Sequence, residues 1–184
     1  MGYRLKGLIE KKKEEIIKNW FEATLQTYAP DTAQFYKGRK DQFANPVGHI
    51  TSEGISFLFA QLLDDFDADA IRTHLDPIIR IRAIQNFTPS QAVGFILLLK
   101  KVLRNRLPEA LRDTATVTEL LAFESKIDQL SLIAFDIYMT CKEKVYQIAA
   151  NEMRNQTFRA LERAGLISQT PQRPKPKKVK SVNH

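Results

Sequence analysis

The chain has 184 residues, of which 43% are apolar and 27% charged, a balance typical of a globular domain rather than of a disordered or fibrous chain. Its single cysteine, Cys141, excludes an intramolecular disulfide and a cysteine-rich zinc site, and it fits a reducing compartment. The first residues carry no secretory pattern, and the longest apolar run, Val93–Leu99, is far too short to span a bilayer. We therefore expect a cytoplasmic protein that is not an integral membrane protein.

The net charge of +7 is concentrated at the C-terminal end of the sequence. Residues 169–184 hold five basic and no acidic side chains, which leaves 23 basic against 21 acidic residues in the rest of the chain. A body so close to neutrality gives no indication of a nucleic-acid-binding face. Three prolines between the lysines disfavour helix and strand in this segment. We expect one helical domain over residues 1–168 and a disordered basic tail over residues 169–184.

The first half of the chain reads as a row of helices. Apolar residues at helical spacing predict a first helix over Leu5–Tyr28, with the charged run Lys11–Glu15 on its solvated side. A short second helix is expected next, with Asp31 as its candidate cap. The pair Asn45–Pro46 then supplies an N-cap and a proline at the first helical position, and predicts a helix that reaches about Phe66.

The middle of the chain contains two further helix starts. Asp67 is expected to cap a helix over Ala68–Gln85, which Pro77 should kink or divide. The segment Thr88–Gln91 has the pattern of a capping box with proline at the first helical position. This pattern predicts a strongly apolar helix that ends at about Leu107.

The last helix is expected to be the longest. Thr116–Glu119 has the pattern of a second capping box, and no glycine or proline follows it before Gly165. One helix of up to about 48 residues, or about 70 Å, can therefore form. No segment alternates apolar and polar residues between turn signals, so we expect no strands. The predicted fold class is all-α, with about five to six helices and a long C-terminal helix.

The sequence holds no recognisable pattern of an active site. It lacks a phosphate-binding glycine loop, the paired histidines of zinc proteases and the nucleophile elbow of serine hydrolases. The acidic segment 64–69 resembles the start of a calcium loop, but Ala70 and Asp76 stand where that loop needs glycine and glutamate. We therefore expect no catalytic residues, no metal site and no cofactor.

Three single residues remain as candidates for a special role. His74 alone among the histidines sits on a helix among apolar residues, so it is the only plausible ligand if the protein were a haem-based sensor. Arg82 shares a helix face with apolar residues, so it should be partly buried and need an acidic partner; whether it is structural or ligand-binding stays open. Cys141 falls on an apolar face and is expected to act as a small hydrophobe.

The last helix carries two apolar faces. One seam steps by three and four residues and should dock on the helix's own domain: Leu120, Phe123, Ile127, Leu130, Ala134, Ile137 and Cys141. A second seam would be left bare unless another copy of the chain covers it, and it is our predicted homodimer interface: Leu132, Phe135, Met139, Tyr146, Ala149 and Met153.

Two segments resemble a known family. Phe43–His49 resembles the F-x-N-P-V-G entry to the second main helix of the RsbRD N-terminal domain family. Asp76–Arg104 is similar to that family's R-x-R-A-x-Q-x-F-x-P-S-x-A block, whose positions here are Arg80, Arg82, Ala83, Gln85, Phe87, Pro89, Ser90 and Ala92. The resemblance extends over about residues 5–165.

This resemblance implies a sensor domain of bacterial stressosome proteins, with a globin-like helical fold that lacks haem and forms dimers. In longer relatives the last helix leads into an output domain, whereas only residues 169–184 follow here, so any signal should pass through another chain. We therefore expect a non-enzymatic signal-sensing or adaptor domain that binds a small effector or a protein partner. The alternatives are a haem-based sensor, a structural accessory subunit of a larger complex, and a nucleic-acid binder acting through the lysine tail.

Overall fold

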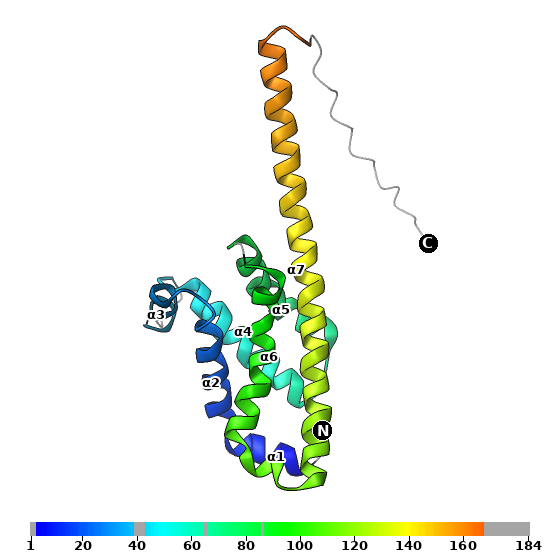
Figure 1. The fold of residues 1–184 in the computed structure, drawn as a ribbon. Helices are drawn as coiled ribbons and strands as arrows, with labels where there is room; N and C mark the ends of the chain where they lie inside the picture. The colour runs from blue at the N-terminus through cyan, green and yellow to red at the C-terminus, as the bar shows by residue number, and fades with distance from the viewer. Residues whose placement is uncertain (1–2, 39–42, 65, 86, 168–184) are drawn as a thin grey trace, which may run out of the picture. The chain divides into compact units, whose positions relative to one another are not determined.

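The computed structural model describes residues 3–38, 43–64, 66–85 and 87–167, and the secondary structure in these ranges is entirely helical. It divides into two compact units, Met1–Val145 and Tyr146–His184. The helices are labelled in Figure 1. The all-α class and the long C-terminal helix are thus confirmed for the described residues. The expected boundary between domain and basic tail, at residue 168, lies outside them. The α-helices are α1 (Tyr3–Lys11), α2 (Lys13–Leu25), α3 (Pro30–Gly38), α4 (Pro46–Leu63), α5 (Ala68–Ile84), α6 (Pro89–Arg106) and α7 (Thr114–Arg163), with one 3-10 turn, η1 (Pro108–Leu111).

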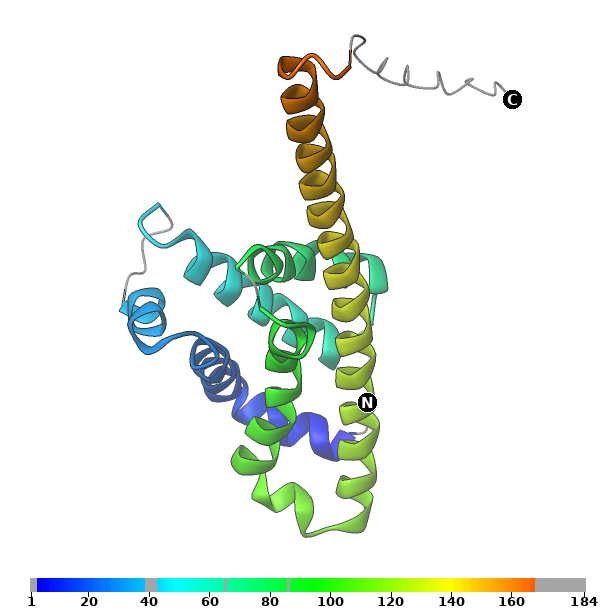
Figure 2. The ribbon, with the colours of Figure 1, turned by 45° about the horizontal axis from the view of Figure 1, so that its top comes forward.

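The core of the first unit is built around two helix pairs. Helix α2 lies beside α6, and α4 lies beside α5 (Figure 2). The indole of Trp20 on α2 is fully buried, stacks on the ring of Phe95 on α6 and donates its N–H to the Phe95 carbonyl at 2.8 Å. At the α4–α5 crossing, Gly54 lies so close to Ile78 that an added Cβ would come within 2.6 Å of the Ile78 Cδ1. Small and large side chains therefore interlock at these crossings.

The expected first helix is in fact two helices, so the described residues form seven α-helices rather than about five to six. The chain breaks at Lys12, which interrupts the helix between α1 and α2. There Lys12 Nζ donates to the carbonyl of Arg106 at 2.8 Å and pairs with Glu109 at 2.9 Å. Lys12 therefore provides a hydrogen-bond donor for the last carbonyl group of α6. The interpretation of the charged run as a solvated helix side was wrong at this residue, because Lys12 has a tertiary partner.

Three of the expected N-caps are confirmed. The Asn45 side chain accepts from the amide of Gly48 at 2.9 Å, and Asp67 accepts from the amides of Asp69 and Ala70. Thr88 forms both halves of its capping box with Gln91. Each cap satisfies backbone N–H groups that have no partner within the helix. Cap chemistry is local, which explains why the sequence was sufficient to predict it.

Other expected boundaries differ from the structure. Helix α7 begins at Thr114, because Asp113 Oδ2 accepts from both the amide and the hydroxyl of Thr116; the expected capping box at Thr116 was wrong. Helix α3 begins at Pro30, which places Asp31 inside its first turn rather than at its cap. Helix α5 runs undivided through Pro77, which lies on the exposed side of the helix.

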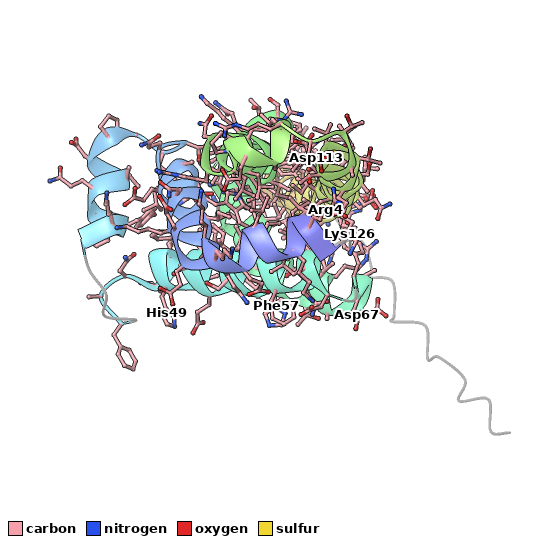
Figure 3. All side chains as sticks on the ribbon, turned by 90° about the horizontal axis from the view of Figure 1, so that it is seen from below. Arg4, His49, Phe57, Asp67, Asp113 and Lys126 are labelled. Atoms are coloured by element: carbon pink, nitrogen blue, oxygen red, sulfur yellow. The ribbon has the colours of Figure 1, made fainter. Side chains whose placement is uncertain are left out.

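The start and the end of α7 are both fixed by specific contacts. Near its start, Arg4 Nη1 pairs with Asp113 at 2.9 Å, and these two side chains lie close together in Figure 3. At its end, Gly165 has a φ of +69°, a left-handed conformation that favours glycine, and the amide of Leu166 returns to the carbonyl of Leu161. None of the helices among the described residues is long and apolar enough to cross a membrane.

Candidate functional site

Within the first unit, α7 presents one buried and one exposed apolar face. The expected inner seam, Leu120 to Cys141, is buried at all seven positions. The other face, which we call the outer face of α7, carries Leu132, Phe135 and Met139, and all three are exposed. Leu132 has 67% of its surface accessible. The two faces therefore differ in burial as their sequence patterns suggested.

The second unit contains the C-terminal part of α7, and the remaining candidate interface residues are exposed there. Tyr146, Ala149 and Met153 follow one another at helical spacing, and Met153 is 70% accessible. Ile148 on the same segment is also exposed. This part of the helix thus presents apolar side chains without a core of its own.

A buried guanidinium joins three helices of the first unit. Arg82 on α5 has no accessible surface. Its Nη1 donates to the Gln91 carbonyl at 3.1 Å, and its Nη2 donates to the Thr24 carbonyl at 3.4 Å and to the Thr27 hydroxyl at 3.0 Å. Arg82 was expected to be partly buried, and the structure buries it completely. The prediction of an acidic partner was wrong for the described residues, because carbonyl and hydroxyl oxygens accept the hydrogen bonds of Arg82 instead.

Aromatic rings enclose the same guanidinium. The Arg82 Cζ lies 4.9 Å from the ring centroid of Tyr28, 5.1 Å from that of Phe87 and 4.6 Å from that of Phe95. Burial lowers the pKa of Arg82, and it also raises the pKa of Tyr28, against the opposing effect of the nearby Arg82 charge. Among the described residues, Arg82 Nε is the one buried side-chain nitrogen or oxygen without a hydrogen-bond partner. The positive charge of Arg82 is therefore stabilised by carbonyl and hydroxyl dipoles and by the faces of aromatic rings.

A groove of about 530 Å³ runs between α2 and α6 on the surface of the first unit. Helix α2 contributes one face to it, with Asn19, Glu22, Ala23 and the C-cap residue Gln26. Helix α6 contributes an equally spaced face, with Leu98, Lys101, Val102 and Asn105. Thr27 also lines the groove, and its hydroxyl is the one that accepts from Arg82. The groove and the buried guanidinium are thus one hydrogen bond apart.

The other two singled-out residues have packing roles. The imidazole of His74 stacks on Phe57 of α4 with ring centroids 3.4 Å apart, and its Nδ1 lies 3.0 Å from the Ala70 carbonyl. Figure 3 marks Phe57 on α4, between His49 and the Asp67 cap. Cys141 is buried at the end of the inner seam of α7, and this burial raises the pKa of its thiol. No group of three or more potential metal ligands occurs in the described part of the chain.

Sequence reasoning found Arg82 and the outer face of α7 but missed the groove. The face that α2 turns to the groove is mostly polar, and such a face is indistinguishable in sequence from an ordinary solvated helix side. The only available signal was the recurrence of amides at Asn19, Gln26 and Asn105.

Comparison with known proteins gives one match. The family model described as the RsbT co-antagonist protein rsbRD N-terminal domain matches residues 14–153. The matched range includes both segments that carry the resemblance, together with Arg82, the groove and most of α7. No curated protein and no solved structure matches the chain.

Proposed function

The chain belongs to the RsbT co-antagonist protein rsbRD N-terminal domain family, and from this premise we propose that it is a non-enzymatic signal-sensing or adaptor domain that works as a homodimer. Family membership supports a signalling role of the stressosome type. The dimer, the globin-like arrangement and the cytoplasmic location are the further parts of the proposal. An unpaired, buried Cys141 fits the reducing interior of a cell.

The observation that carries the homodimer is the exposed apolar outer face of α7. Leu132, Phe135 and Met139 are exposed, whereas the opposite seam of the same helix is buried in the core of the first unit. Apolar surface removed from water stabilises an association by about 25 cal/mol per Å². Folded monomers rarely leave a continuous apolar patch bare. A second copy that presents the same face offers the matching surface of a two-fold interface.

The proposed mechanism is a change in packing that passes along α7. Because α7 is one continuous helix over Thr114–Arg163, a shift at its buried seam changes the position of residues on its outer face. A ligand or partner can drive such a shift only if it binds two arrangements of the domain with different affinity. The output is then a change in what the dimer presents to another protein.

The experiment is to measure the mass in solution of the intact protein and of matched variants. We expect the wild type to scatter light as twice the 21.1 kDa chain at concentrations of tens of micromolar. Tyr146→Glu combined with Met153→Glu should give monomers with unchanged helicity, because each carboxylate would have to be desolvated in the interface. Leu132→Glu combined with Phe135→Glu tests the outer face of α7, which lies in the first unit.

The control adds the same number of carboxylates to the other side of the same helix. Asn151→Glu combined with Asn155→Glu should stay dimeric, since these residues are about half a turn away from Tyr146 and Met153 on α7. A wild-type protein that is monomeric at tens of micromolar would contradict the homodimer.

A further inference from the structure

We propose that the groove between α2 and α6 binds a small organic monoanion with an apolar body, and that this ligand is the effector of the domain. The inference rests on the proposed signalling function and specifies the chemistry of the signal. It is carried by the groove itself, by an unpaired lysine on its edge, and by the hydrogen bond from its Thr27 to the buried Arg82.

The groove has the size of a small-molecule site and a lining of both polar and apolar side chains. Its volume of about 530 Å³ is within the range of ligand pockets, about 300–1,000 Å³. Ala23, Leu98 and Val102 provide apolar surface for the body of a ligand, and the side-chain amides of Gln26 and Asn105 can hydrogen-bond to it. The Asn19 amide is already engaged, because it donates to the Glu15 carbonyl at 2.6 Å and accepts from Arg106 at 2.9 Å. Such a combination can orient a ligand through its polar groups while the apolar side chains cover one side of the ligand.

The charge of the groove favours an anion. Glu22 is paired with Lys37 at 3.0 Å, and Arg106 is paired with Glu15 at 2.7 Å, so each of these lining charges already has a counter-ion. Lys101 has no ion pair among the described residues. One positive charge is therefore left for a ligand, and the side-chain N–H groups of Gln26 and Asn105 can donate to the same anion.

A hydrogen bond also connects the lining of the groove to the core. Thr27 lines the groove and accepts from Arg82, whose Nε is the buried nitrogen without a partner. The Arg82 guanidinium packs on the ring of Phe95, which in turn stacks on Trp20. A ligand that displaces Thr27 changes the hydrogen bonds of a buried charge, which a packed core cannot absorb without rearrangement. Trp20, the only tryptophan, is thus a built-in reporter of this change.

The test uses isothermal titration of the full chain with benzoate and with hexanoate, two monoanions with apolar bodies of different shape. Benzamide and benzylammonium serve as the neutral and cationic probes. We expect saturable binding of at least one of the two anions, and binding of the other two probes at least about ten-fold weaker, because a hydrogen bond to a charged group is lost. Lys101→Met should weaken anion binding by the same factor, whereas Lys18→Met, an exposed lysine of α2 outside the groove, should not.

The coupling to the core is tested by the fluorescence of Trp20 during the same titrations. We expect anion binding to change the emission, and Thr27→Val to reduce that change by half or more while anion binding persists. The site is overturned if neither anion binds at about 10 mM, if benzamide or benzylammonium binds as tightly as the tighter-binding anion, or if Lys101→Met binds that anion like wild type. The route through Arg82 is overturned if Thr27→Val responds like wild type. Light scattering on the same samples reports the dimer independently, so the two proposals fail separately.

Discussion

The guanidinium of Arg82 lies in the core without a carboxylate partner among the described residues. The cost of burying its charge is offset by carbonyl groups at helix ends and by aromatic rings. The Thr24 carbonyl that accepts from it belongs to the last turn of α2, where the helix dipole places partial negative charge. The Gln91 carbonyl belongs to the first turn of α6, so the same side chain ties two helices to α5. Arg82 therefore acts as a cross-link whose loss should be costly.

Replacement of Arg82 by alanine should lower the free energy of unfolding by about 3 kcal/mol or more. The change removes three hydrogen bonds and leaves a cavity among three aromatic rings. The matched control is Arg80→Ala, which removes an exposed arginine paired with Asp76 one helical turn away and should stay within about 0.5 kcal/mol. Urea unfolding of both variants measures the difference. Equal destabilisation by the two changes would contradict the structural role of Arg82.

The start of α7 should give folding a dependence on pH. Hydrogen bonds from the hydroxyl and the amide of Thr116, together with Arg4, hold the pKa of Asp113 below its ordinary value. A lowered pKa in the folded state stabilises the fold at every pH above the ordinary carboxyl pKa, and this contribution is lost as the pH falls through the lowered value. Asp113→Asn should therefore be less stable than wild type near neutral pH.

The difference between the two proteins should shrink as acid protonates the wild-type Asp113. Urea midpoints recorded from about pH 6 to about pH 3 follow this change. Thr116→Val removes one donor to the carboxylate and should reduce the pH dependence without abolishing it. A difference between Asp113→Asn and wild type that is constant over the whole range would contradict the assignment.

At the scale of the helix, two glycines in the interiors of helices are in opposite environments. Gly54 in α4 faces Ile78 and the His74 carbonyl of α5, whereas a Cβ on Gly94 in α6 would meet nothing within 4 Å. Glycine in the interior of a helix lowers its stability by about 1 kcal/mol relative to alanine. A close helix crossing can nonetheless require glycine, because it has no side chain. The α4–α5 pair therefore depends on Gly54, while no contact with a described residue explains Gly94.

Alanine at these two positions should change stability in opposite directions. Gly54→Ala should destabilise by about 1–3 kcal/mol, because its Cβ overlaps the Cδ1 of the buried Ile78 and lies 3.3 Å from the His74 carbonyl, so the Ile78 side chain must repack within the core. Gly94→Ala should stabilise by up to about 1 kcal/mol through helix propensity alone. Thermal unfolding of the two single variants measures both effects. The packing argument fails if Gly54→Ala is as stable as Gly94→Ala.

Local signals predicted the helices well, and tertiary contacts decided where the prediction failed. The caps Asn45, Asp67 and Thr88 act on amides two or three residues away, so their sequence patterns contain the whole interaction. The break at Lys12 depends instead on the Arg106 carbonyl, which is 94 residues away in sequence. Likewise, Arg82 donates to a backbone carbonyl, and no pattern of residue types in the sequence reveals such a partner.

On the scale of the whole molecule, the two units differ in how they bury apolar surface. The buried hydrophobic residues of the described chain all lie at or before Cys141, within the unit Met1–Val145. Between Val145 and Leu166 the described apolar residues are exposed or half-buried. Folding free energy should therefore reside in the first unit, and the apolar surface of the second unit should serve association.

A chain shortened to Met1–Val145 should separate these two roles. We expect it to unfold cooperatively with a midpoint close to that of the monomeric Tyr146→Glu, Met153→Glu variant, because it keeps every buried residue of the core. It should also associate more weakly than the full chain, because Tyr146, Ala149 and Met153 are gone while Leu132, Phe135 and Met139 remain. Thermal unfolding and light scattering over a concentration series measure the two effects. A shortened chain that is unfolded would show that the first unit depends on residues after Val145, and one that dimerises like the full chain would place the interface entirely on the first unit.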